Sequence, residues 1–168
     1  MGKTITITAD PAYDYIVEEV DFPIELNDFK VLSFYQDREG FMWFGGVDGV
    51  IRYDGVRFKT FEYDPFDKHS VPFAWIFDIQ QDDNNYIWLN GRSGLIKYDP
   101  ENGRFRRFIN PAPPHGNLEW NKFLSMALDH GSIWIGTQKG LCRFDTEREI
   151  FDSYTRFSKN NSDVRTYE

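Results

Sequence analysis

One residue pattern occurs three times in this chain and constrains its fold more than any other feature. The segments FMWFGGVDGVIRYD, YIWLNGRSGLIKYD and SIWIGTQKGLCRFD align without a gap, and their tryptophans are 45 and 46 residues apart. A period of this length indicates a repeat architecture. The shared positions are the tryptophans Trp43, Trp88 and Trp134, the glycines Gly49, Gly94 and Gly140, and the aspartates Asp54, Asp99 and Asp145.

Each copy divides into four short stretches with alternating apolar and polar residues. This alternation favours strands, and no segment shows the 3.6-residue spacing of an amphipathic helix. Four-stranded units of about 40–50 residues are typical of propeller blades. We therefore predict an all-β fold, a β-propeller fragment of three four-stranded antiparallel blades with partial end strands. The blades are expected at residues 31–63, 74–110 and 121–157.

The two ends of the chain lack the tryptophan pattern. Residues 1–30 contain YDYIVEEVDF, a candidate closing strand, and residues 158–168 are expected to start a truncated fourth blade. Propellers usually have 4–8 blades, and unpaired sheet edges promote association. Other propeller blades or a second copy of the chain are therefore expected partners.

The repeated residues are interpreted as structural. One blade cannot bury its own faces, so the tryptophans are expected to fill the layers between blades, and the aspartates to accept backbone N–H groups in their turns. Cys142 aligns with Ile51 and Ile96 and is expected to be a core residue. The aligned cations suggest either an outward face or a repeated salt bridge; they are Arg52, Lys97 and Arg143.

Composition excludes several classes of function. The chain has a net charge of −8 and a pI near 4.9, which opposes nucleic-acid binding. No apolar run reaches the ~20 residues that span a bilayer, so no membrane contact is expected for this segment. No catalytic motif is present, and the three histidines lack metal-ligand spacing. We therefore predict no enzyme activity, no metal and no cofactor.

The long inter-blade connections and the turns between second and third strands are the better candidates for binding. They include DPFDKHSVPFAW and NPAPPHGNLEWN. An aromatic plane could stack on a sugar ring while polar neighbours supply hydrogen bonds. The alternative is that the tryptophans of these two connections, Trp75 and Trp120, cover a blade edge. The candidate ligand-binding residues are Trp75, Trp120, Asn121, Arg92, Asp48 and Lys139.

The motif strings QDREGFMWFGGVDGVIRYDG, QDDNNYIWLNGRSGLIKYDP and LDHGSIWIGTQKGLCRFDT resemble the two-component regulator propeller repeat. Departures from the usual pattern are Val50 for Leu, Asn85 for the turn Gly, and Asn90 within Trp-Ile-Gly. The resemblance implies the extracytoplasmic sensor region of a membrane-bound hybrid histidine kinase, located in the periplasm.

The resemblance further implies that the signal is an oligosaccharide. We therefore expect a ligand-sensing propeller fragment, with kinase modules outside this chain. A protein-interaction scaffold without a small-molecule ligand is the alternative, and a propeller lyase or glycosidase is a third class. Fold alone does not choose among them, because unrelated functions share propellers.

Overall fold

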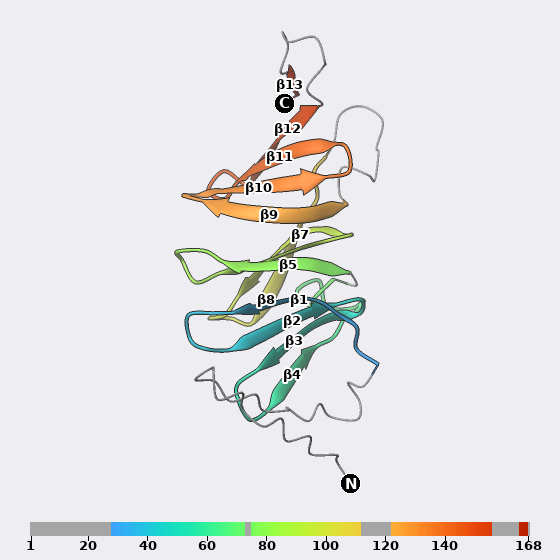
Figure 1. The fold of residues 1–168 in the computed structure, drawn as a ribbon, viewed down its shortest axis with the longest axis vertical. Helices are drawn as coiled ribbons and strands as arrows, with labels where there is room; N and C mark the ends of the chain where they lie inside the picture. Colours follow the sequence, from blue (N-terminus) through green and yellow to red (C-terminus); the bar gives the residue numbers. More distant parts are fainter. Residues whose placement is uncertain (1–27, 73–74, 112–121, 156–164, 168) are drawn as a thin grey trace, which may run out of the picture.

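A computed structural model of the chain describes residues 28–72, 75–111, 122–155 and 165–167, and these residues form strands and turns without helices. The strands make three antiparallel sheets, each built from consecutive strands. The sheets stack along the longest axis of the molecule (Figure 1). The predicted all-β fold of four-stranded propeller blades is confirmed.

Each blade keeps the strand order of the sequence. Blade 1 comprises β1 (Val31–Gln36), β2 (Met42–Gly46), β3 (Gly49–Tyr53) and β4 (Phe58–Phe61). Blade 2 comprises β5 (Ile76–Gln81), β6 (Ile87–Gly91), β7 (Gly94–Asp99) and β8 (Arg104–Phe108). Blade 3 comprises β9 (Phe123–Asp129), β10 (Ser132–Thr137), β11 (Gly140–Asp145) and β12 (Ile150–Thr155).

A thirteenth strand, β13 (Arg165–Tyr167), lies within the residues expected to start a fourth blade. It pairs antiparallel with β12, with Ser153 opposite Tyr167, and becomes a fifth strand on the outer edge of blade 3. An edge strand offers unpaired N–H and C=O groups, which a short neighbouring segment can satisfy. The candidate closing strand within residues 1–30 lies outside the described residues.

The turns between first and second strands follow the sequence differences. In blades 1 and 2 a positive φ occurs once, at Gly40 (89°) and Asn85 (66°). In blade 3 the turn is one residue shorter, and both His130 (36°) and Gly131 (84°) have positive φ. Two consecutive positive φ values are typical of a type I′ hairpin. The shorter turn therefore changes type while the hairpin is kept.

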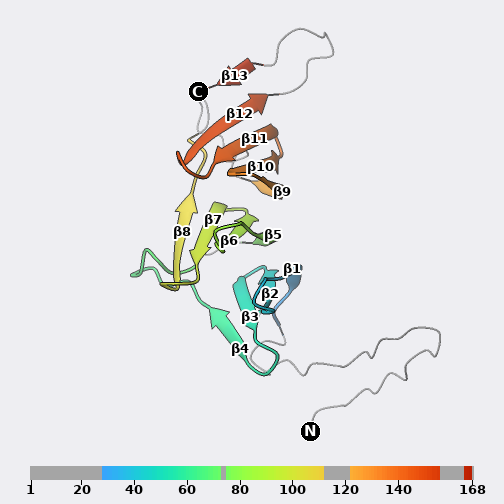
Figure 2. The ribbon, with the colours of Figure 1, turned by 90° about the vertical axis from the view of Figure 1, so that its left-hand side faces the viewer.

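The core lies between the blades, in two layers. The first contains Trp43, Phe61 and Tyr98, and the second contains Trp88, Phe108 and Phe144. Neighbouring blades contribute opposite faces to each layer, as predicted for stacked repeats. The first strands β1, β5 and β9 run along one side of the stack, and β4 and β8 run along the other (Figure 2).

Two further faces of the stack carry the turns. We call the side with the β2–β3, β6–β7 and β10–β11 turns the loop face, and the side with the β1–β2, β5–β6 and β9–β10 turns the turn face. No described residue belongs to a helix long and apolar enough to cross a membrane.

Candidate functional site

An aspartate at the end of each first strand holds the repeated tryptophan. The Trp43 indole Nε1 donates to Asp37 Oδ2 over 2.7 Å, and Trp88 Nε1 donates to Asp82 Oδ2 over the same distance. The other oxygen of Asp37 accepts the backbone N–H of Phe41 at 2.9 Å. A buried indole N–H needs a partner. This aspartate is therefore the structural residue that sequence reasoning left without a role.

The three tryptophans differ in burial. Trp43 is 0% and Trp88 1% exposed, because each lies under the next blade. Trp134 is half-buried and packs beside Tyr154 of its own blade, with ring centroids 5.9 Å apart. The position is the same in all three repeats. Its burial is decided by whether a further blade covers it.

The repeated aspartates at the ends of third strands organise the following turns. Asp54 Oδ1 accepts the N–H groups of Val56 at 2.8 Å and Arg57 at 2.6 Å. Asp145 Oδ1 accepts the N–H of Arg148 at 2.8 Å, and these bonds hold the pKa of both carboxyls below the usual value. Asp99 Oδ1 accepts the N–H of Glu101 at 2.9 Å.

The repeated glycines close the loop-face turns. Gly94 has a φ of 112°, and an added Cβ would lie 2.4 Å from the backbone oxygen of Phe108. Gly49 has a φ of 127°, with the corresponding oxygen of Phe61 at 3.2 Å. Residues that have a Cβ atom rarely adopt this backbone conformation. Gly140, with a φ of 155°, occupies the same place in blade 3.

The aligned cations neither form an outward face nor repeat one salt bridge. Arg52 lies 4.2 Å from the ring centroid of Phe41, and Lys97 lies 3.3 Å from that of Tyr86. Both cover the aromatic residue that precedes the second strand. In blade 3 that residue is Ser132, and Arg143 instead donates to its hydroxyl and pairs with Asp152 at 3.6 Å.

Two of the predicted ligand-binding residues, Trp75 and Arg92, form one unit on the loop face. The guanidinium of Arg92 lies 3.8 Å from the Trp75 ring centroid, and its backbone N–H donates to the Trp75 oxygen at 3.1 Å. Phe77 approaches Trp75 edge-on at 6.3 Å. Trp75 is half-buried. Because the Arg92 guanidinium lies over one face of its ring, the unit presents a cation beside an aromatic surface.

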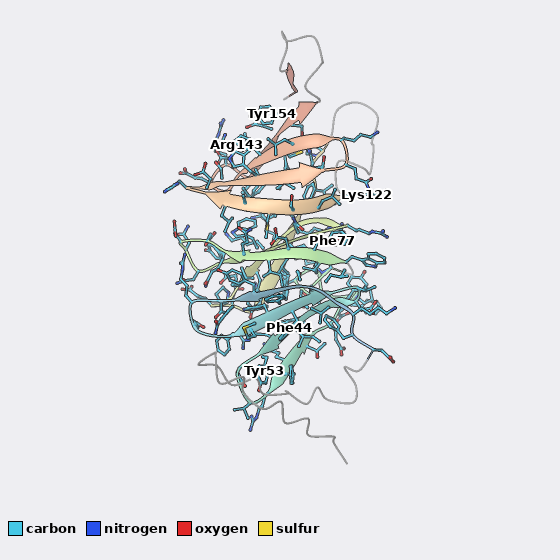
Figure 3. The ribbon with its side chains drawn as sticks, in the orientation of Figure 1. Phe44, Tyr53, Phe77, Lys122, Arg143 and Tyr154 are labelled. Carbon is cyan, nitrogen blue, oxygen red and sulfur yellow. The ribbon has the colours of Figure 1, made fainter. Side chains whose placement is uncertain are left out.

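The other predicted residues are distributed around this unit. Asp48 and Lys139 are exposed on the corresponding turns of blades 1 and 3. Trp120 and Asn121 lie outside the described residues. By strand register, the position of Trp75 corresponds to Lys30 in blade 1 and Lys122 in blade 3. Figure 3 labels Phe77 and Lys122 on the same side of the stack, on adjacent blades.

Part of the long connection before Trp75 lies away from the loop face. The backbone carbonyl oxygen of His69 accepts the N–H of Phe105 on β8 at 2.8 Å, which places this stretch on the outer rim of blade 2. Asp64, Asp67 and Ser70 fold it through local side chain–backbone bonds. Only the Trp75 end of DPFDKHSVPFAW therefore contributes to the loop face.

Asn90 is the most unusual residue of the loop-face hairpins. It is 0% exposed, yet among the described residues neither its Nδ2 nor its Oδ1 has a hydrogen-bond partner, and Ser93 Oγ in the following turn also lacks one. Blades 1 and 3 have Gly45 and Gly136 at this position. Burying an amide without a hydrogen-bond partner lowers the free energy of unfolding. The Asn90 departure from the Gly pattern was the sequence signal for it.

The turn face has a different character. A groove of about 440 Å³ between blades 2 and 3 is lined by Asp82, Asp83, Asp129 and His130. The Asp129 carboxylate raises the pKa of the exposed His130 imidazole, and their hydrogen bond lowers the pKa of Asp129. Within the described residues no group of His, Cys, Asp and Glu side chains could hold a metal ion.

The single cysteine lies in the second core layer. Cys142 is 0% exposed, and burial raises the pKa of its thiol. Asn110 Nδ2 donates to Cys142 Sγ at 3.3 Å and to Ser153 Oγ at 2.8 Å. A buried thiol with a raised pKa is a poor nucleophile.

Comparison with known proteins agrees with this geometry. Residues 26–48 match the family described as two component regulator propeller. The match confirms the resemblance that the tryptophan repeat indicated, so the chain carries a propeller repeat of this type. A search of the curated proteins gave no significant match.

Solved structures show the same fold. The extracellular domain of BT3049 from B. thetaiotaomicron, described as a hybrid two component system, matches with a TM-score of 0.69 and 23% identity, over 81% of this chain and 20% of that one. The extracellular domain of BT4673 from the same organism matches with a TM-score of 0.62 and 21% identity, over 86% of this chain and 17% of that one. The chain thus spans about a fifth of the length of these solved chains.

Proposed function

We propose that this chain is a ligand-sensing part of the extracytoplasmic propeller of a two-component regulator, and that its loop face recognises an oligosaccharide. The main support is the Trp75–Arg92 unit, in which an aromatic ring and a guanidinium 3.8 Å apart are presented together on a rigid blade. Sugar rings offer both apolar faces and hydroxyl groups, so an aromatic surface beside a donor suits them. Family likeness supports the sensing role.

The surroundings of this unit support a hydroxyl-rich and partly acidic ligand. Asp48, exposed on the corresponding turn of blade 1, offers a carboxylate that can accept hydrogen bonds from sugar hydroxyl groups. Lys30 and Lys122 flank Trp75 at the equivalent positions of the neighbouring blades. The net charge of the chain is −8, but these cations make the potential at the loop face locally favourable for the carboxylates of uronic acids.

The experiment is a binding screen with defined oligosaccharides. Neutral glucose and xylose oligomers and oligogalacturonate are added to the chain, and a ligand is detected by an increase in melting temperature and then titrated by calorimetry. Trp75→Ala and Arg92→Ala are each expected to weaken binding by about tenfold or more, equivalent to about 1.4 kcal/mol.

The matched controls are Phe66→Ala and Lys68→Ala. Phe66 is 97% exposed and Lys68 is exposed, and both lie on the connection at the outer rim. They should leave affinity unchanged. If no oligosaccharide of either type stabilises the chain, the protein-interaction scaffold becomes the better description. Equal losses in the Phe66 and Trp75 variants would contradict the proposed position of the site.

A further inference from the structure

A second surface, on the outer rim between blades 2 and 3, is independent of the loop face. It is a groove of about 760 Å³ formed by the end of β8 and the turn into β12. Its walls include Ile109 and Ile150, which are 49% and 41% exposed, and the half-buried Phe151. Neighbouring exposed apolar side chains in a groove are typical of interaction sites.

The backbone at this groove has an open sheet edge. β8 is the last strand of blade 2, and no strand of the described residues lies on its outer side. The Phe105 N–H points outward, because it donates to His69. Strand groups alternate in direction, so the N–H and C=O of Arg107 also point outward. They have no partner among the described residues.

The corresponding edge of blade 3 already accepts an added strand. β13 pairs with β12 through Ser153, Tyr154 and Thr155. The other half of β12, from Ile150 to Asp152, is left outside this pairing and lines the groove. The outer rim of the stack is therefore compatible with strand addition, the mode in which an extended peptide extends a sheet.

The charges of the groove define the sign of a partner. Its two acids are already engaged: Glu149 forms a bidentate pair with Arg106, and Asp152 pairs with Arg143 at 3.6 Å. Arg107 and Arg148 are exposed and form no ion pair with any residue in the described ranges. The chain as a whole has a charge of −8, but the two unpaired cations of the groove favour an acidic partner at this place.

We propose that this groove binds an extended peptide segment of a partner protein in which acidic residues alternate with apolar ones. The segment adds to the outer edge of β8. Its backbone pairs with the outward groups of Arg107, its apolar side chains contact Ile109 and Ile150, and its carboxylates face Arg107 and Arg148. Successive side chains of a strand point to opposite faces, so an alternating sequence separates the acidic side chains of the peptide from its apolar ones.

The test uses a fluorescent peptide that alternates aspartate with valine, measured by anisotropy against the full chain. Two comparison peptides replace aspartate with lysine, or carry N-methyl groups on the backbone amides of the aspartate peptide. Binding is expected only for the unmodified acidic peptide. The double variant Arg107→Glu, Arg148→Glu should weaken it at least about tenfold.

The control is the double variant Arg57→Glu, Arg104→Glu, which makes the same charge change at exposed residues outside the groove. It should change affinity less than about twofold. Arg107→Pro removes the outward N–H at an edge position where proline is tolerated, and should also weaken binding. Retained melting temperature shows that these variants are folded.

Several outcomes overturn the proposal: no binding of the acidic peptide, equal binding of the lysine or N-methylated peptide, or equal losses in the groove and control variants. The sugar-site variant Trp75→Ala should bind the peptide normally. Loss of the oligosaccharide response and loss of peptide binding can thus be distinguished.

Discussion

The two seams between blades are built by the same repeated residues but differ in polarity. The first seam, between blades 1 and 2, is mostly apolar: Trp43 stacks on Phe61 at 5.5 Å and meets Tyr98 edge-on at 5.2 Å. Its polar contacts are fewer: the Ser33 hydroxyl donates to the Ile76 oxygen at 3.2 Å, and Arg38 bonds Gln81 through its N–H and contacts Asp83 through its guanidinium.

The second seam, between blades 2 and 3, has an apolar layer as well, but polar side chains line it where β5 faces β9. Asp78 accepts the N–H of Met126 at 2.9 Å, and Gln80 bonds both the Met126 oxygen and the Leu128 N–H. These side chains satisfy the inner edge of β9. The unpartnered Asn90 lies on the same blade face.

The difference teaches that the repeat fixes how blades stack, while the residues between the repeated positions fix how firmly. An apolar seam gains from burial alone, at about 25 cal/mol per Å². A polar seam gains only where every group is paired, and an unpaired amide subtracts from it. The stability of the second seam therefore depends on the pairing of its polar groups as well as on burial.

The largest expected effect comes from truncating the buried tryptophans. Trp43→Ala and Trp88→Ala should each lower the free energy of unfolding by about 3–5 kcal/mol, because each removes a fully buried side chain. Trp134→Ala, at the half-buried equivalent position, should cost clearly less. Urea denaturation of the three variants measures the order, and a Trp134 loss equal to the others would contradict the role assigned to the covering blade.

At one repeated position, substitution by alanine should change the free energy of unfolding in opposite directions at the two seams. Gly45→Ala should lower the free energy of unfolding by about 1–3 kcal/mol, because the added Cβ would lie 2.5 Å from Ser33 Oγ and 2.6 Å from Ile76 Cγ2. Asn90→Ala should leave it unchanged or raise it, because the unpaired amide is removed. Both variants place alanine at equivalent sites, so each controls the other.

If Asn90→Ala destabilises as much as Gly45→Ala, the Asn90 amide is paired in solution, and an ordered water at this site would be the explanation. The same denaturation series decides this, with addition of a bound oligosaccharide as a second condition. Stabilisation by the ligand that disappears in Asn90→Ala would link the amide to the loop-face site.

The smallest effect concerns pH at the turn face. The Asp129 carboxylate raises the pKa of His130 above 6.5, so the stabilisation is fully present below that value and is lost as pH rises through the folded-state pKa. Stability should therefore fall slightly as the pH rises above 6.5. His130→Gln should flatten this profile, and a His69→Gln variant should not.

The fold was predictable because its signals are local and repeated three times. Alternation marked the strands, and the residues with positive φ marked the turns. The paired roles of Asp37 and Trp43 were not assigned, although the six-residue spacing that joins them recurs in blade 2. The partner of a buried indole depends on the pleat of two strands, which spacing alone does not give.

The candidate site was only partly predictable. Trp75 and Arg92 were both identified from loop composition, but their contact was not, since Trp75 precedes β5 and Arg92 follows β6, 17 residues later. The stretch around His69 was assigned to the same face, whereas the structure places it beside β8. A long connection can take many paths, and its path is set by the edge that offers it a hydrogen bond.

By itself, the sequence determined the number of blades, their strand order and the residues that fill the layers between them, because period and alternation are properties of the chain. The tertiary structure decided which residues at equivalent repeat positions share the same burial and the same contacts. Trp134 is less buried than Trp43, Asn90 is unpaired where Gly45 is crowded, and β13 joins β12. Each outcome depends on a neighbouring blade or edge, and such contacts between distant segments leave no mark in local spacing.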